Sequence, residues 1–258
     1  MKTNRTISAI AGLGLTVLFT QADLANAAEI KVWTARAIAT VLAEVGPQFE
    51  RTTGHRLNVY PGLSTDFERR ANAGDSFDLM VNAASPVDRW IRESKMVAQT
   101  RTYIARSGIG VEVRAGARKP DIGSVEAFKR ALLDAKSIGY LRVGSGLYLH
   151  GLLERLGIAE AVRSKVTRPE SDIVSELVAK GELELGMVVI TQILTTPGVE
   201  LVGPLPPEIQ SYVEFVAGVS ANSKAPDAAK QLIRFLTGPT AIPVIRAQGM
   251  ELTGRGDR

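Results

Sequence analysis

Short apolar segments alternate with segments of helical periodicity along most of this chain, and that alternation limits the folds available to it. An apolar strand is expected at residues 30–33, and apolar residues then recur at helical spacing as far as Gly54. Further strands are expected at 57–60, 77–81, 109–113, 138–141, 185–190, 199–202 and 213–219. Helices are expected between most of these, and two close the chain, around 228–236 and 240–247. The pattern predicts an α/β protein with mostly parallel sheets flanked by helices. For 258 residues, two lobes of roughly 100–120 residues fit better than one oversized sheet.

The first residues have the three-part pattern of a secretory signal peptide. Lys2 and Arg5 precede an uncharged apolar run over residues 7–19, and Ala25 and Ala27 form a small-residue cleavage site. We therefore predict a signal peptide at residues 1–27 and a mature protein located in a bacterial periplasm. An N-terminal membrane anchor is the alternative, but the run is short for a span of roughly 20 residues.

The residue content excludes several classes of chemistry. The chain has no cysteine, which excludes disulfides, thiolate metal sites, iron–sulfur clusters and cysteine nucleophiles. It has two histidines, far apart in sequence, too few for a His-rich metal site. Its 31 basic residues are dispersed, so no nucleic-acid partner is expected. We predict no metal, no cofactor and no catalytic residue.

Enzyme signatures are also missing, since the chain has no G-x-S-x-G elbow, H-E-x-x-H or P-loop. His55 follows a helix in the turn 53–55 and is expected on the surface, while His150 is expected on a solvated helix face. A secreted α/β hydrolase with an unrecognised serine stays an alternative; it requires a serine within hydrogen-bond reach of His55 or His150.

Four corners between a strand and the next helix are small and polar, at residues 34–37, 62–65, 82–85 and 144–148. Ligands of open α/β sheets bind beyond the carboxyl ends of the strands, where helix N-termini present unpaired N–H groups and a positive dipole end to an anion. Any one such corner is explained equally by ordinary helix capping; Ser85, followed by Pro86, reads as such an N-cap. Gly46-Pro47 is expected to kink the first helix.

Arg36 is the candidate charge partner of a ligand. It directly follows the first strand, and a guanidinium there suits a carboxylate through bidentate pairing. An exposed or structurally paired arginine is the alternative.

At these corners the sequence resembles the extracytoplasmic solute-binding proteins of ABC importers, in their molybdate-binding-like branch. The similarity extends in order over nearly the whole mature chain. It is carried by residues 32–37, 49–54, 73–79, 82–84, 144–148, 152–157, 181–186 and 235–239.

The resemblance implies the type II periplasmic binding protein fold, with two lobes joined by a two-strand hinge that close over a ligand. One lobe would combine residues 28–106 and 217–258, and the other would hold 107–216. The crossing strands would lie near 107–113 and 212–219. The implied partner is an ABC permease in the inner membrane, and the protein is expected to be a monomer.

The ligand follows less directly from the resemblance. Molybdate binders of the family hold the oxyanion with a serine at the first corner, where this chain has Ala37 beside Arg36. Ser64 or Thr65 matches the hydroxyl of the second corner, and residues 145–147 match the backbone contacts of the third. A tyrosine frequent after the late strand is replaced in the run 188–191.

These observations predict a substrate-binding protein of an ABC importer that captures a small anion, an organic carboxylate being favoured slightly over molybdate, tungstate or a similar oxyanion. A solute receptor that feeds a membrane sensor is a further alternative. The predicted ligand-binding residues are Thr34, Ala35, Arg36, Ser64, Thr65, Ala84, Ser145, Gly146, Tyr148 and Ile173.

Overall fold

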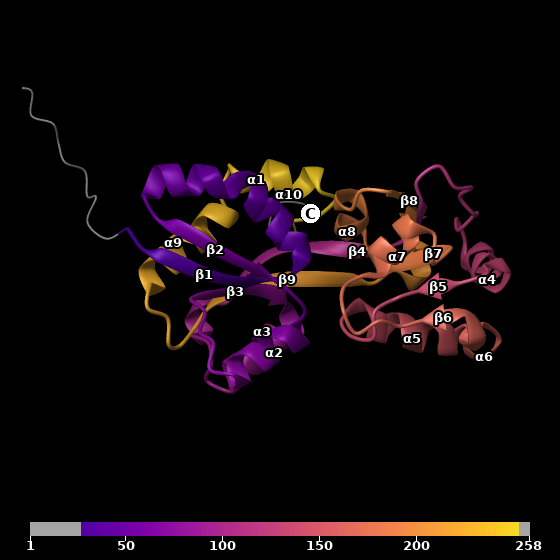
Figure 1. Cartoon of the computed structure of the whole chain (residues 1–258), viewed down its shortest axis with the longest axis horizontal. Helices are drawn as coiled ribbons and strands as arrows, with labels where there is room; N and C mark the ends of the chain where they lie inside the picture. Colours follow the sequence, from indigo (N-terminus) through magenta and orange to yellow (C-terminus); the bar gives the residue numbers. More distant parts are fainter. Residues whose placement is uncertain (1–26, 253–258) are drawn as a thin grey trace, which may run out of the picture.

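The fold is built on nine strands joined into one continuous mixed sheet, whose strands are labelled in Figure 1. The structure is a computed structural model and describes residues 27–252. Residues 1–26 of the predicted signal peptide lie outside the described residues. The main strand order is β2-β1-β3-β9-β4-β7-β5-β6, and β8 pairs with β4. This confirms the predicted α/β class, with helices packed on both faces of the sheet.

The N-terminal part of the sheet is formed by three parallel strands, each followed by a helix. The strands are β1 (Glu29–Thr34), β2 (Arg56–Pro61) and β3 (Leu79–Ala83). The helices that follow them are α1 (Arg36–Thr53), α2 (Ser64–Asn72) and α3 (Ala84–Arg92). Because parallel strands share one direction, all three strand-to-helix corners lie at the same edge of the sheet.

The other part of the sheet has the same design with shorter strands. Its parallel strands are β5 (Ile138–Gly139), β6 (Val166–Thr167) and β7 (Leu185–Val189), and β8 (Val199–Pro204) runs antiparallel to β4. Its helices are α4 (Val125–Asp134), α5 (Ser145–Arg155), α6 (Ala159–Val162), α7 (Val174–Lys180) and α8 (Ile190–Thr195).

Two long antiparallel strands, β4 (Thr102–Arg114) and β9 (Tyr212–Val219), connect the two parts and cross the middle of the molecule in Figure 1. β4 pairs with β9 as far as Gly108, and from Ile109 onward it pairs with β7 and β8. At this change of partner the side-chain amide of Gln210 accepts a hydrogen bond from Ile109 N and donates one to Ile109 O, both at 3.0 Å. A single strand therefore belongs to both halves of the sheet.

Both faces of the N-terminal part of the sheet are buried, and alternate side chains enter different cores. Leu79 and Val81 pack in a core with α1 and the C-terminal helices, whereas Met80 packs on the opposite face with Trp33 and Trp90. The second half has two further cores, one against α4 and α5 and one against α7 and α8. This two-sided burial is what continuous apolar runs in parallel strands predict.

The chain ends in two helices, α9 (Pro226–Leu236) and α10 (Ala241–Ala247), which pack beside α1. The start of α9 is tied to the sheet by Asp78, which is 5% exposed. Asp78 Oδ1 accepts hydrogen bonds from Ser223 Oγ and Lys224 N at 2.8 and 2.9 Å, and Oδ2 accepts one from Lys31 N at 2.9 Å. One buried carboxylate thus joins the first strand to the residues just before α9.

In residues 27–252 no helix is both long and apolar enough to cross a bilayer.

Several boundaries differ from the sequence-based expectation. The strand expected at 185–190 ends at Val189, and Ile190 begins the short helix α8. The strand expected at 109–113 is the end of the thirteen-residue β4, because its first half pairs with β9. α6 and β6 were not expected, and each is very short.

Two local predictions are corrected. The N-cap of α3 is Ala83 and the helix begins at Ala84, so Ser85 and Pro86 lie inside its first turn. His55 is buried, at 8% exposed, and its Nδ1 accepts a hydrogen bond from Ala28 N at 3.1 Å. α1 continues through Pro47 as one helix of 18 residues, and the kink at Gly46-Pro47 stays a prediction.

We expect the substitution Asp78→Ala to lower the free energy of unfolding by about 3 kcal/mol, because it leaves buried backbone and hydroxyl donors without an acceptor. Urea denaturation followed by circular dichroism measures this difference. Asp227→Ala is the matched control, since Asp227 also lies at the start of α9 but is 87% exposed. Equal losses in the two variants would refute the role assigned to Asp78.

Candidate ligand-binding cleft

The first two strand-to-helix corners of the N-terminal part, after β1 and β2, face the start of α7 across a cavity of about 770 Å³. Sheet pairing brings the corners together, since Thr34 lies beside both Pro61 and Val81. The cavity is lined by Arg36, Ala39, Thr40, Ala43, Pro61, Gly62, Leu63, Asp66, Ser171, Asp172, Ile173, Glu176, Ala179, Lys180, Thr195, Thr196 and Pro197. Segments from both halves of the sheet therefore build one cleft.

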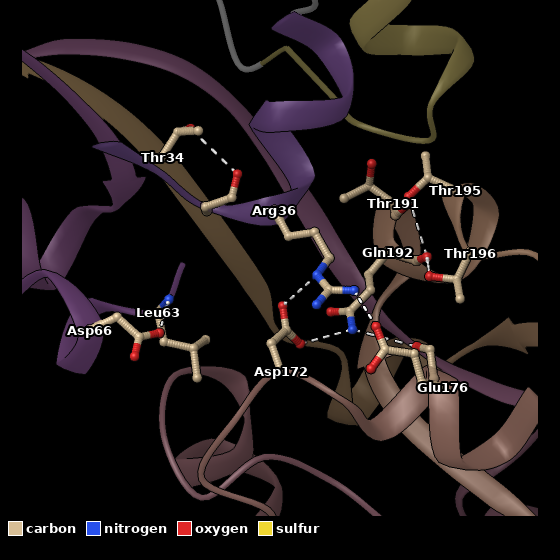
Figure 2. Close-up of polar contacts among 12 residues, drawn as sticks. Thr34, Arg36, Leu63, Asp66, Asp172, Glu176, Thr191, Gln192, Thr195 and Thr196 are labelled. Atoms are coloured by element: carbon tan, nitrogen blue, oxygen red, sulfur yellow. Dashed lines mark hydrogen bonds and ion pairs between the residues drawn. The ribbon is translucent and has the colours of Figure 1, made fainter. Parts of the chain in front are cut away.

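Arg36 crosses this cleft and pairs with two carboxylates of the opposite half, as Figure 2 shows. It is the first residue of α1. Its Nη1 donates a hydrogen bond to Glu176 Oε1 at 2.7 Å, and its Nε lies 3.4 Å from Asp172 Oδ2. Among residues 27–252 its Nη2 group makes no hydrogen bond.

The two carboxylates compensate an unfavourable position of the guanidinium. The N-terminus of a helix carries partial positive charge, and the first turn of α1 has no acidic residue and no side-chain cap. Burial lowers the pKa of Arg36, but the hydrogen bond with Glu176 and the charges of Asp172 and Glu176 outweigh it, so the pKa is raised. The positive charge at the start of α1 is thus balanced by two carboxylates of the opposite half.

Asp172 is the more buried of the two acids, with a side chain 14% exposed. Its Oδ1 accepts a hydrogen bond from Gln192 Nε2 at 2.9 Å. Burial raises the pKa of Asp172, and the charges of Glu176 and Asp66 add to that, while Arg36 and Gln192 act in the opposite direction. The ionised form of Asp172 therefore depends on the guanidinium beside it.

Behind Asp172 lies a second carboxyl, Glu112 on β4, which is fully buried. Ser175 Oγ donates a hydrogen bond to its Oε1 at 2.9 Å, and its Oε2 has no partner among the described residues. Gln192 Nε2 lies 3.4 Å from Ser175 Oγ and so links the two acids. Burial raises the pKa of Glu112 to about 7, the charge of Asp172 contributing in the same direction.

An apolar contact also crosses the cleft. Leu63, which precedes α2, packs against the core formed by α7, α8 and their strands. Asp66 holds this residue in place, since Asp66 Oδ2 accepts a hydrogen bond from Leu63 N at 3.0 Å. The two halves therefore meet through both ion pairs and a half-buried leucine.

Two of the predicted ligand-binding residues, Arg36 and Ile173, line the cavity. At the second corner Gly62 and Leu63 line it, whereas Ser64 begins α2 half-buried and Thr65 is exposed. Ala35 and Ala84 are half-buried at the starts of α1 and α3 and do not line the cavity.

The hydroxyl groups of Thr34 and Tyr148 each donate a hydrogen bond within the protein. Thr34 is fully buried, and its Oγ1 donates to Val81 O at 3.1 Å, so it has no surface to offer a ligand. Tyr148 Oη donates to Ile209 O at 2.7 Å, and the guanidinium of Arg155 lies 5.1 Å from the centre of its ring. Its hydroxyl is therefore already engaged.

The corner at residues 144–148 requires its glycines because of the path of the backbone. Gly144 has φ +60°, a conformation that disfavours residues with a Cβ atom. A Cβ atom on Gly146 would lie 1.6 Å from Leu141 O, so only glycine fits there. Ser145, the first residue of α5, is half-buried outside the cavity.

Sequence reasoning missed Asp172, Glu176 and Gln192. One signal was available, because acids at positions i and i+4 near the start of a helix lie on one face and favour the helix N-terminus. That they meet Arg36 could not be inferred, since 136 and 140 residues separate them from it along the chain.

Neither histidine is arranged for catalysis with a serine in residues 27–252. His55 Nδ1 contacts Ala28 N, and His150 Nδ1 lies 3.4 Å from Tyr140 Oη. The side chain of His150 is 47% exposed, as expected. The described part of the chain also holds no cluster of three or more acidic or histidine side chains that could bind a metal ion.

Comparison with known proteins identifies the family. The family model described as bacterial extracellular solute-binding protein matches residues 30–251. The chain belongs to this family. Its fold is that of the type II periplasmic binding proteins: the periplasmic molybdate-binding protein of Azotobacter vinelandii superposes with a TM-score of 0.74 at 20% identity, over 87% of this chain and all of that one.

Two curated relatives differ in the function that their names state. Aconitate isomerase of a Pseudomonas species is 27% identical over 228 residues, which cover 86% of this chain and 87% of the relative. The molybdate-binding protein ModA of Azotobacter vinelandii is 28% identical over 239 residues, which cover 88% of this chain and 92% of the relative. Binding proteins and a named enzyme thus share this architecture.

We expect Glu112 to contribute stability to the folded protein that is lost as the pH rises from about 4.5 to 7. In the unfolded chain the pKa of Glu112 is near 4.5, whereas in the folded chain it is about 7. Between these pH values the folded chain therefore retains a proton that the unfolded chain has lost. Glu112→Gln should remove this contribution, so the loss of unfolding free energy between pH 4.5 and 7.5 should be about 3 kcal/mol smaller in the variant.

Urea denaturation at a series of pH values measures the difference, and groups common to both proteins cancel. Glu126→Gln is the control, since Glu126 is 72% exposed on α4. Parallel stability curves for the wild type and Glu112→Gln would show that Glu112 is not protonated in the folded chain.

Proposed function

We propose that this protein is the periplasmic substrate-binding component of an ABC importer and that its ligand is a small organic carboxylate held in the cleft. The observation that carries the proposal is Arg36, which brings a guanidinium to the start of α1 inside the cavity. In this proposal the protein acts as a monomer and presents its closed form to a permease in the inner membrane.

A carboxylate fits this guanidinium better than a tetrahedral oxyanion does. The planar N–H groups of arginine match the two oxygens of a carboxylate, and Nη2 makes no hydrogen bond among the described residues. An oxyanion site would be expected to have a serine at this corner. This chain has Ala37 there, which is 4% exposed and has no hydroxyl group. The relative named aconitate isomerase supports a carboxylate ligand, because aconitate is a tricarboxylate. The relative named molybdate-binding protein supports an oxyanion instead.

We expect Arg36→Ala to abolish carboxylate binding and leave the fold intact, since the side chain is 39% exposed. A thermal-shift screen of the purified protein against trans-aconitate, citrate, succinate, molybdate, tungstate, sulfate and phosphate tests this. A ligand at 100 times its Kd stabilises the native state by about 2.7 kcal/mol, which corresponds to a rise in Tm of about 5–10 °C.

Arg56→Ala is the matched control, because Arg56 also pairs with a glutamate but is 79% exposed on β2. It should retain the full shift. A shift with molybdate or tungstate alone would refute the carboxylate, and an undiminished carboxylate shift in Arg36→Ala would refute the anchoring role of Arg36.

Isomerisation of an unsaturated tricarboxylate is a second candidate function, favoured by the position of Asp172. Moving a double bond along such a molecule requires one proton to leave one carbon and one to reach another, with no change in oxidation state. The cleft places a carboxyl group that can exchange a proton, Asp172, next to the guanidinium that would anchor the substrate. A relative is named as aconitate isomerase.

If this candidate is right, incubation with trans-aconitate should yield cis-aconitate, observed by proton NMR, and Asp172→Asn should slow the reaction by at least about 100-fold. Binding of trans-aconitate to the variant, measured in parallel, separates loss of chemistry from loss of affinity. An absence of cis-aconitate with protein that binds trans-aconitate would leave binding as the function.

A further inference from the structure

One guanidinium in the cleft is shared by two carboxylates that belong to the protein itself. Asp172 and Glu176 approach Arg36 from the opposite half of the sheet, and all three line the same cavity (Figure 2). They make the contacts with Arg36 that the carboxylates of a ligand would make. A carboxylate that binds Arg36 through two nitrogens, Nη2 and either Nε or Nη1, therefore takes over one of these contacts.

The charges around Arg36 make that exchange unequal for the two acids. The charged side chains that line the cavity are Arg36 on α1, Asp66 on α2, Asp172 before α7, and Glu176 and Lys180 on α7. Glu112 on β4 lies behind Asp172. Acids thus outnumber bases, and the side chain of Asp172 is 14% exposed against 39% for Glu176.

Asp172 also has the weaker link to Arg36. Its separation from the guanidinium is 3.4 Å, compared with 2.7 Å for Glu176. A buried carboxylate that loses its cation and faces a second anion is strongly disfavoured in its charged form. Gln192, whose amide is its remaining hydrogen-bond partner, carries no charge.

We propose that a di- or tricarboxylate displaces Asp172 from Arg36 and that the displaced Asp172 takes up a proton, so that ligand binding is coupled to protonation of the cleft. This inference rests on the proposed carboxylate-binding function. The proton comes from solvent, and it prevents Asp172, Glu176 and the ligand from placing three negative groups against one guanidinium. By linkage, affinity then increases as the pH falls, by up to about tenfold per pH unit.

The test is isothermal titration calorimetry of the purified protein with trans-aconitate at pH 6, 7 and 8, each in two buffers of different ionisation heat. The difference between buffers gives the number of protons taken up. We expect close to one proton for the wild type at pH 7–8. Asp172→Asn should take up none and should bind about tenfold more tightly than the wild type at pH 8, because its amide does not compete for Arg36.

Glu170→Gln is the matched control, since Glu170 lies in the same loop and pairs with Arg142 but does not line the cavity. It should behave as the wild type. Protonation of trans-aconitate itself is common to all three proteins and cancels in the comparison.

Each outcome decides between the function and the coupling. Binding without proton uptake in the wild type overturns the coupling and leaves the carboxylate function standing. Loss of binding in folded Asp172→Asn also overturns the coupling, because it makes Asp172 a ligand contact. Absence of heat with trans-aconitate, together with no thermal shift for any carboxylate in the screen, overturns the carboxylate function and the coupling together. The proton count of the wild type needs no variant, so it holds if Asp172→Asn fails to fold.

Discussion

The continuity of β4 is the constraint on which the rest of this structure depends. Its first half pairs with β9 in one part of the sheet, and its second half pairs with β7 and β8 in the other. The two parts are consequently placed so that the starts of α1 and α7 face one another. The cavity, the ion pairs of Arg36 and the contact of Leu63 all lie between segments that β4 and β9 position.

The cleft contains both positive groups that attract an anion and negative groups that repel it. The start of α1 and its guanidinium attract negative charge, while Asp66, Asp172 and Glu176 already supply it. An anion therefore binds by exchange with carboxylates of the protein and not by simple addition. Such exchange makes the affinity depend on how much it costs to neutralise a buried acid, and so on residues such as Gln192 and Glu112 that lie behind the cavity wall.

Periodicity was enough to predict the α/β class and most strands, because buried parallel strands are continuous apolar runs. Position in sequence was enough to place Arg36, since a residue directly after a parallel strand lies at the binding edge of the sheet. The division into residues 28–106 with 217–258 and 107–216 stays a prediction.

Side-chain direction was beyond the reach of sequence patterns. Thr34, like Arg36, lies at the carboxyl end of β1, yet its hydroxyl donates a hydrogen bond to Val81 O inside the sheet. His55 was expected outside and lies inside, because a backbone N–H 27 residues earlier supplies its partner. The partners of Arg36 depend on how two distant segments approach one another, which no local pattern encodes.

The amide of Gln210 gives the join between the two halves a particular mechanical property. At Ile109, where β4 changes partners, a side chain supplies both a donor and an acceptor in addition to the neighbouring backbone. A side chain follows small rotations of the strand by adjusting its own torsions, whereas a backbone partner would have to move with its whole strand. At this joint the glutamine thus shares Ile109 with the backbone of Leu205 and Ser211, and it can keep its two bonds through a small change of angle between the halves of the sheet.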